Sequence, residues 1–442
     1  MADTEHQYPE SVDVAIIGAG PAGVAAATRL AEVGRSVLTL ERRRHPRFHI
    51  GESMLPHTMA VLDRLGALDL VQGHGYIVKR GTELIFADGE HRRVAFADQG
   101  PGRYPETFQC ERAHFDALLV QHAREAGATV IEEAPVYDLM IEQGRVVGLK
   151  YQARGKARTV RARFVIDAGG RVSKIAETFN LRHPVQHIRN VAVYRHYTGM
   201  DEKYNPGYEG DTQFGGHQDG WVWAIPIWKD VISVGTVMPQ SVLRDGTPQG
   251  LFAEHLSRVP QITARLSGAE PRGELRIEAD YNYYTESVTG PGWFLAGDSA
   301  CSADPIFSGG VHLALTTGMA AGERVAEILS EPHREEELQD SYSRFYKTGY
   351  DTYARLTYVY YESRYNLGRY LRTLGADAQG KWFTRMLSGD FWSEHNPISR
   401  LLRSNPNWDT FEAFEPLYGD PVYRDLDAEE RKEKEEARVA AA

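Results

Sequence analysis

The chain has 442 residues, of which 42% are hydrophobic and 25% charged, and its formal net charge is -11 at pH 7. This length suits one large domain or two interleaved domains. The negative charge argues against nucleic acid as the main partner, because phosphate binding needs a basic surface. No apolar run is long enough for a membrane span, and the polar N-terminus does not resemble a secretory signal. We therefore expect a cytoplasmic protein with no metal site, in which Cys110 and Cys301 are buried thiols.

The N-terminal segment predicts a dinucleotide-binding strand–helix–strand unit. A β-rich apolar run over 12–17 leads into a glycine-rich turn, a helix over 24–33 and a second strand over 36–40. The glycine spacing permits a tight turn, close approach of backbone N–H groups to a pyrophosphate, and close packing of helix on strand. A glycine turn without a ligand is the alternative, and the complete motif disfavours it. The predicted ligand-binding residues are Gly18, Gly20, Ala22, Gly23 and, at the ribose, Glu41.

The remaining pattern predicts an α/β fold in which a Rossmann-type domain is interleaved with an antiparallel sheet domain and followed by a helical C-terminal region. We expect helices over 56–65 and 114–126, an antiparallel excursion over 136–167, a strand over 294–297 and a long helix from about His312. The predicted boundaries are 1–190 for the cofactor domain with inserted segments around 70–110, 191–284 for the sheet domain, 285–335 for the return to the cofactor domain, 336–425 for the helical region and 426–442 for a charged tail.

Three further segments resemble the fingerprints of p-hydroxybenzoate hydroxylase-type flavoproteins. They are 110–116 (CERAHFD), 164–170 (FVIDAGG) and 293–300 (WFLAGDSA). The resemblance implies FAD, with Arg112 along the cofactor, Asp298 at its ribityl chain and Ser53 as a further contact. A helix N-cap is the alternative role for Asp298. No second GxGxxG unit is present, so reducing equivalents are expected from a separate flavin reductase.

Two more segments resemble the signatures of flavin-dependent halogenases. They are the WxWxIP sequence over 221–226 and the Gly-containing segment that leads to Lys79. The resemblance extends from the first strand to about residue 330. It implies that reduced FAD, oxygen and chloride or bromide yield hypohalous acid, and that Lys79 acts on it as a hydrogen-bonding ammonium or as a haloamine. Trp221, Trp223 and Pro226 would then separate substrate from flavin. The alternatives are a solvated lysine and core tryptophans that share one strand face.

The loop over 304–311 precedes the predicted long helix, and glycine N–H groups there suit an anion. Family resemblance maps the halide to Gly309 and Gly310; a flavin contact without halide is the alternative. Halogenases of free tryptophan are longer and carry a glutamate where this chain has Phe307. The chain therefore resembles the branch acting on phenols or pyrroles, often tethered to an acyl or peptidyl carrier protein.

Other roles stay open at this point. Glu52 or His49 could activate a phenol as a base, and the tyrosines over 338–374 suit a cover over the cofactor domain better than a substrate surface. The alternative functions are an FAD-dependent aromatic hydroxylase of the same fold and a non-catalytic module that binds flavin or docks a carrier protein.

Overall fold

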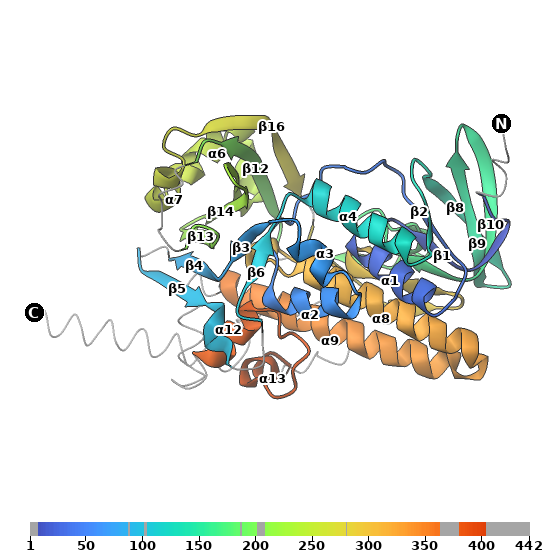
Figure 1. Ribbon diagram of the computed structural model, residues 1–442. Coiled ribbons are helices and arrows are strands. Elements are labelled where there is room, and N and C mark those ends of the chain that lie inside the picture. Colours follow the sequence, from blue (N-terminus) through green and yellow to red (C-terminus); the bar gives the residue numbers. More distant parts are fainter. Residues whose placement is uncertain are drawn as a thin grey trace, which may run out of the picture.

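The computed structural model of the protein describes residues 8–86, 89–100, 104–185, 188–200, 208–279, 281–362 and 380–403 (Figure 1). It is a mixed α/β structure in which two large sheets lie toward opposite ends of the molecule. None of the helices in these ranges is long and apolar enough to cross a membrane. The expected charged tail over 426–442 lies outside the described residues, as does the predicted helical sequence from 363 to 374.

The first sheet has eight strands and is built around β1 (Ser11–Ile17), which pairs in parallel with β10 on one side and β2 on the other. The last four residues of β1 are buried, as its continuous apolar run requires for a central parallel strand. The order β18-β19-β10-β1-β2-β7 forms the main path, and β9 and β8 extend it from β10. The other strands are β2 (Val37–Leu40), β7 (Thr129–Ile131), β8 (Val136–Glu142), β9 (Arg145–Ala153), β10 (Lys156–Asp167), β18 (Thr289–Gly290) and β19 (Trp293–Leu295).

Two helices that are far apart in sequence pack closely on this sheet. Helix α1 (Pro21–Glu32) begins directly after the glycine turn, and α8 (Gly310–Ser330) lies beside it. A Cβ atom on Gly318 of α8 would lie 2.1 Å from the Ala22 carbonyl oxygen, so only glycine permits this approach. The preceding and intervening helices are α2 (Pro56–Arg64), α3 (Leu68–Gln72), α4 (Arg112–Glu125) and α5 (Lys174–Thr178), with short 3-10 turns η3 (Gly297–Ser299) and η4 (Pro305–Phe307).

The second sheet has seven strands in the order β16-β12-β15-β14-β13-β4-β5. All neighbours are antiparallel except β13 and β4, which are parallel. The strands are β4 (Gly81–Ile85), β5 (His91–Ala95), β12 (Asn190–Thr198), β13 (Thr212–His217), β14 (Gly220–Trp228), β15 (Val231–Pro239) and β16 (Glu270–Ala279). Short pairs add β3 (Ile77–Lys79) with β6 (Thr107–Gln109) and β11 (Arg182–Pro184) with β17 (Tyr283–Thr285), while η1 (Phe96–Gln99), η2 (Gln240–Arg244), α6 (Pro248–Ser257) and α7 (Pro260–Arg265) complete this part.

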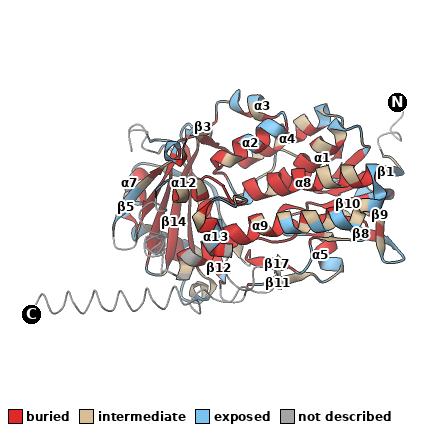
Figure 2. Ribbon diagram, turned by 90° about the horizontal axis from the view of Figure 1, so that it is seen from below, coloured by how far each residue is buried: buried red, intermediate tan, exposed pale blue. Residues whose placement is uncertain are grey.

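The tyrosine-rich segment forms α9 (Glu335–Glu362), which packs against α8, and Figure 2 marks many buried residues along both helices. Its tyrosine hydroxyls donate to backbone carbonyls at the end of β19 and in η3: Tyr342 to Leu295 at 2.7 Å and Tyr346 to Gly297 at 2.8 Å. The helix therefore covers this end of the first sheet and holds the following turn in place. The turn η5 (Pro332–Arg334) precedes it, and α12 (Lys381–Leu387) and α13 (Pro397–Arg403) follow.

Predicted elements and observed elements differ mainly at their ends. Helix α4 begins at Arg112, two residues before the predicted start, and α8 begins at Gly310 instead of His312. Strand β19 spans Trp293–Leu295, whereas the predicted strand extended to Gly297. Gly297 instead begins the 3-10 turn η3. Such ends depend on local hydrogen bonding that periodicity does not resolve.

The close packing of α1 on α8 leads to a stability prediction. Replacing Gly318 by alanine should destabilise the fold by about 1–3 kcal/mol, because overpacking against backbone outweighs the helix propensity gained, which is below about 1 kcal/mol. A thermal melt measures the change. Gly380→Ala is the matched control, since its Cβ meets nothing within 4 Å. Equal melting temperatures for both variants would contradict the packing argument.

Candidate active site

The glycine turn after β1 has the geometry that a dinucleotide pyrophosphate requires. Gly18 has a φ of +92°, and a Cβ there would lie 2.6 Å from the Ala168 carbonyl oxygen. A Cβ on Gly23 would lie 1.9 Å from the Gly18 oxygen, whereas one on Gly20 would meet only an arginine tip at 3.7 Å. Gly18 and Gly23 are therefore constrained by the fold, and Gly20 leaves room for a ligand at the N-terminus of α1.

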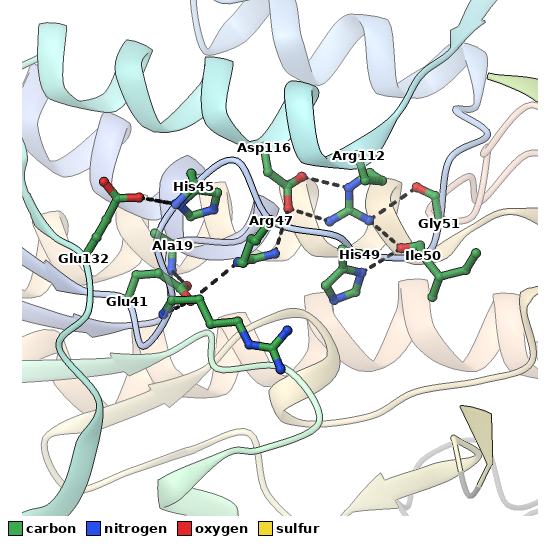
Figure 3. Close-up of polar contacts among 11 residues, drawn as sticks. Ala19, Glu41, His45, Arg47, His49, Ile50, Gly51, Arg112, Asp116 and Glu132 are labelled. Atoms are coloured by element: carbon green, nitrogen blue, oxygen red, sulfur yellow. Dashed lines mark hydrogen bonds and ion pairs between the residues drawn. The ribbon is translucent and has the colours of Figure 1, made fainter. Parts of the chain in front are cut away.

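Glu41 follows β2 and is tied to this turn. Its carboxylate accepts hydrogen bonds from Ala19 N at 2.9 Å and from Arg43 N at 3.0 Å (Figure 3). The Arg47 guanidinium lies between Glu41, at 3.5 Å, and Asp116, at 3.3 Å. The carboxylate is thus fixed beside the turn, where ribose hydroxyls could bind to it.

Arg112 is held rigidly at the start of α4. Its Nε and Nη2 donate to the two carboxylate oxygens of Asp116 at 2.7 and 3.0 Å, and its Nη1 donates to Ile50 O at 2.8 Å (Figure 3). Bidentate pairing fixes both the position and the plane of a guanidinium. Arg112 therefore forms a preorganised positive wall.

One cavity joins most of the predicted cofactor residues. Its lining extends from Glu41 and Val136, near the glycine turn, to Gly310 and Trp223 beneath the second sheet. Such an elongated cavity, with a glycine turn near one end and aromatic walls at the other, fits the extended shape of FAD. The predicted residues that line it are Gly18, Gly20, Ala22, Glu41, Ser53, Arg112 and Asp298; Gly23 instead provides the close packing behind the turn.

Asp298 lies in η3, shortly after β19, and lines the cavity. Enclosure raises the pKa of this carboxyl to about 6, against the opposing effect of nearby arginines, first among them Arg112. Hydroxyl groups that donate to the carboxylate would favour its charged form. The site therefore suits the polyol chain of a flavin.

The two tryptophans of β14 face the cavity together. Trp221, Trp223 and Ile225 line it, and the two indole centroids are 5.6 Å apart. Both indole N–H groups are satisfied: Trp221 donates to Tyr361 Oη at 2.8 Å and Trp223 to Ser233 Oγ at 3.2 Å. These residues therefore form a fixed aromatic wall.

Pro226 does not belong to this wall. The predicted barrier included it, but alternation along β14 turns it away from the face that carries Trp221, Trp223 and Ile225, and it does not line the cavity.

The loop before α8 places the two predicted halide residues differently. Gly310 lines the cavity and a Cβ there would meet nothing within 4 Å, whereas a Cβ on Gly309 would lie 2.4 Å from the Tyr353 ring. Gly309 is thus packed from behind, and Gly310 faces open space at the N-terminus of α8. The buried Asp304 carboxylate accepts from Ile306 N at 3.3 Å, and Tyr353 donates to Asp304 O at 2.7 Å, which fixes the loop.

Lys79 ends β3 and is buried, with only 1% of its surface exposed. Its Nζ donates to Ser53 Oγ at 2.9 Å and to Met54 O at 3.2 Å, and lies 5.2 Å from the centroid of the Phe96 ring. Burial lowers the pKa of Lys79 to about 7, and Asp211 opposes this shift. Lys79 does not itself line the cavity, but Ser53 does, so one hydrogen bond separates the amine from the cavity wall.

Several residues of the site were not predicted. Phe48, Tyr194, Phe214, Tyr281, Tyr350 and Tyr353 add aromatic surface to the cavity. The alternation of aromatic residues along 191–214 was the available signal for two of them; the others come from loops and from α9. Glu52 and His49, the two candidate bases, also line the cavity, and Glu52 Oε1 lies 2.9 Å from His196 Nε2. Within the described ranges, no group of three His, Cys, Asp or Glu side chains could hold a metal ion.

Comparison with known proteins identifies the family. A family model described as an FAD binding domain matches residues 11–347. A tryptophan 2-halogenase of Chondromyces crocatus is 31% identical over 364 residues, covering 80% of this chain and 69% of that protein. The flavin-dependent halogenase armH1 of Armillaria mellea is 33% identical over 354 residues, covering 73% of this chain and 66% of that protein. The chain thus spans about two thirds of the length of these relatives.

Solved structures agree with this relationship. The flavin-dependent brominase Bmp2 superposes with a TM-score of 0.81 at 26% identity, covering 89% of this chain and 98% of that chain. The myxobacterial chondrochloren halogenase CndH superposes with a TM-score of 0.78 at 28% identity, covering 92% and 94%. The α/β fold class, FAD and the use of halide, all predicted from the sequence, are confirmed. The chain belongs to the flavin-dependent halogenases, oxidoreductases that use reduced FAD, oxygen and a halide.

Proposed function

We propose that this halogenase forms hypohalous acid in the flavin cavity and that Lys79 transfers the halogen to an electron-rich aromatic substrate. The observation that carries the proposal is a buried amine, with a pKa of about 7, one hydrogen bond from the cavity wall. Reduced FAD bound in the cavity supplies the oxidising chemistry once oxygen arrives. The residues of the chain do the rest: they bind halide, exclude substrate and hold the amine.

The halide is assigned to the backbone N–H groups of Gly309 and Gly310. Gly310 faces the open cavity at the N-terminus of a 21-residue helix, where N–H groups and the helix dipole attract an anion. The Trp221 and Trp223 rings, on β14 of the second sheet, form the aromatic wall of the same cavity. A ring-sized substrate is thereby kept from the flavin, which favours halogenation over the hydroxylase alternative.

Lys79 is suited to act as a neutral amine. In that form its two N–H groups are satisfied by Ser53 Oγ and Met54 O, and its lone pair remains available. The lone pair attacks the halogen of hypohalous acid, so an N–X bond forms as the O–X bond breaks. The hydroxide released takes a proton from nitrogen and leaves as water. The aromatic carbon then attacks the halogen, the N–X bond breaks, and the ring proton returns to the amine.

The substrate proposed is a phenol or pyrrole, free or carried by an acyl or peptidyl carrier protein. Phe307, in place of the glutamate of tryptophan halogenases, supports this class. A relative named tryptophan 2-halogenase makes indole a necessary member of any substrate panel. Glu52 and His49 both line the flavin cavity, so neither is assigned as the base of a substrate kept beyond the aromatic wall. A separate flavin reductase is proposed as the source of reduced FAD.

Lys79→Ala should lower halogenated product at least about 100-fold, because the transfer step loses its reacting group. FAD affinity and oxygen consumption by reduced flavin should stay within twofold of the original protein, since Lys79 does not line the cavity. Mass spectrometry of products from a panel of phenols, pyrroles, indoles and carrier-bound acyl groups measures the loss. Full halogenation by this variant would remove Lys79 from the proposal.

The yield of halogenated product per reduced FAD should rise with pH through about 7 as a single ionisation. The pKa of Lys79 is lowered to about 7, so the reactive neutral amine predominates above that value and the ammonium below it. Expressing the yield per FAD oxidised separates this effect from the pH dependence of the flavin chemistry. Lys79→Arg, which stays protonated, is the control and should show no such rise. A yield that falls as pH increases would assign the ammonium form instead.

Bromide soaked into crystals of the FAD-loaded protein should give an anomalous peak beside the backbone nitrogens of Gly309 and Gly310. Gly310→Val should weaken bromide binding at least tenfold by filling the open space, with the melting temperature preserved. Absence of the peak at saturating bromide would contradict this halide site.

A further inference from the structure

The Ser53 hydroxyl lies between Lys79 and the cavity, and the groups around it indicate where its hydrogen points. Ser53 Oγ lies 2.9 Å from Lys79 Nζ and 3.0 Å from Thr212 Oγ1. Its residue is 4% exposed and forms part of the cavity wall. This chain of hydrogen bonds continues from Thr212 to the Gln109 side chain and from there to the backbone carbonyl of Gly210.

Counting donors and acceptors fixes the orientation of the Gln109 amide and favours one direction between the two hydroxyls. Gln109 Nε2 donates to the Gly210 carbonyl at 3.1 Å, which fixes the orientation of the amide, because a carbonyl oxygen only accepts. The same Nε2 donates its second hydrogen to Thr212 Oγ1 at 2.6 Å. Either hydroxyl can donate in the contact between Thr212 Oγ1 and Ser53 Oγ. Thr212 is fully buried and is not among the cavity-lining residues, so donation from Thr212 is favoured because it leaves the cavity-lining hydroxyl, and not the enclosed one, with a hydrogen to spare.

Ser53 Oγ therefore accepts two hydrogen bonds, one from Thr212 and one from the Lys79 amine. When the amine donates to Ser53 Oγ and keeps its lone pair for the halogen, both lone pairs of that oxygen are used, and neither Lys79 nor Thr212 accepts the Ser53 hydrogen. The side that remains for this hydrogen is the cavity that Ser53 lines. A buried donor left unsatisfied is unfavourable, so the site favours an acceptor in the cavity at this position.

We propose that Ser53 is a further catalytic residue, whose hydroxyl donates to the oxygen of hypohalous acid and turns the halogen toward Nζ of Lys79. An acceptor bound by Ser53 lies beside the amine, because the same oxygen accepts from Nζ. The oxygen is polarised as it leaves, and the halogen faces the lone pair that attacks it. This inference rests on the proposed function, in which hypohalous acid reaches Lys79 from the flavin cavity.

The test compares Ser53→Ala, Thr212→Val and Thr212→Ser in the FAD-loaded protein. Ser53→Ala should lower the yield of product per reduced FAD about tenfold, as the loss of one hydrogen bond in a transition state implies. The lost oxidant should appear in solution as halogenation of an added diketone scavenger. Thr212→Val should have a smaller effect, about threefold, because Ser53 keeps its hydroxyl but loses the donor that directs it, and Thr212→Ser should restore the yield.

Two measurements without turnover distinguish this role from a structural one or from cofactor binding. The dissociation constant of oxidised FAD should stay within twofold in Ser53→Ala. A ¹³Cε NMR titration of lysine should show that Lys79 remains buried with its pKa still far below that of an ordinary lysine. Ser399→Ala removes another buried serine hydroxyl, which donates to Met386 Sδ at 3.2 Å, and controls for the general cost of losing a buried hydroxyl.

Each result has a definite meaning. An unchanged yield in Ser53→Ala overturns the inference, and so does a tenfold loss of FAD affinity with an unchanged yield per bound flavin, which would assign the hydroxyl to the cofactor. Failure of the original protein to form either halogenated product or scavengeable oxidant would instead remove the proposed function on which the inference rests.

Discussion

The proposed site depends on a buried amine, Lys79, whose hydrogen-bonding partners are neutral groups that only partly replace the hydration of its charged form. Lys79 donates hydrogen bonds to a hydroxyl and a carbonyl. Burial lowers its pKa, and the negative charge of Asp211 opposes this decrease. That carboxylate is itself bonded to Arg93 Nε at 2.7 Å, which offsets much of its field at the amine. The free energy that burial costs the ammonium form exceeds the stabilisation that the hydroxyl and carbonyl dipoles give it. The neutral amine therefore becomes accessible near pH 7. A carboxylate in direct contact would have kept the side chain charged and removed its nucleophilic character.

The proposed mechanism requires that the oxidant reach this amine and that the organic substrate stay away from the flavin. The aromatic wall to which we assign this separation is held by hydrogen bonds as well as by packing. Gly235 on β15 leaves the space that the Trp223 ring occupies, since a Cβ there would lie 2.2 Å from the indole. The indole N–H groups are both satisfied, so neither ring gains by rotating toward the cavity. Ser53 lines the same cavity and hydrogen bonds Lys79, so it provides a polar connection between the cavity and the amine.

The helix α9 fixes the other side of the cavity. Its tyrosines donate to carbonyls at Leu295, Gly297 and Asp304, which precede or flank Asp298 and the loop before α8. Tyr361, at the end of the same helix, accepts from Trp221 and also hydrogen bonds the Asp304 side chain. One helix thus links the turn that carries Asp298, the loop before α8 and the aromatic wall. Its hydrogen bonds explain why tyrosine, rather than phenylalanine or leucine, recurs along it.

Much of this architecture follows from local sequence. The glycine turn, Glu41 and the apolar β1 run predict the dinucleotide site, because tight turns, helix N-termini and buried parallel strands have residue requirements that act over few positions. The WxWxIP alternation predicts that both tryptophans share one face, since side-chain direction in a strand has a period of two. The same alternation, applied strictly, also excludes Pro226 from that face.

The tertiary structure alone decided which of these residues meet. Lys79 follows a loop-like segment in sequence, where a lysine is ordinarily solvated, yet β3 pairs with β6 and buries the amine beneath Ser53. The chain from Gln109 through Thr212 to Ser53 joins positions separated by 103 and 159 residues, and no sequence period connects them. The protonation of Lys79 and the direction of the Ser53 hydroxyl depend on these long-range contacts, because desolvation and hydrogen-bond counting are properties of the packed interior.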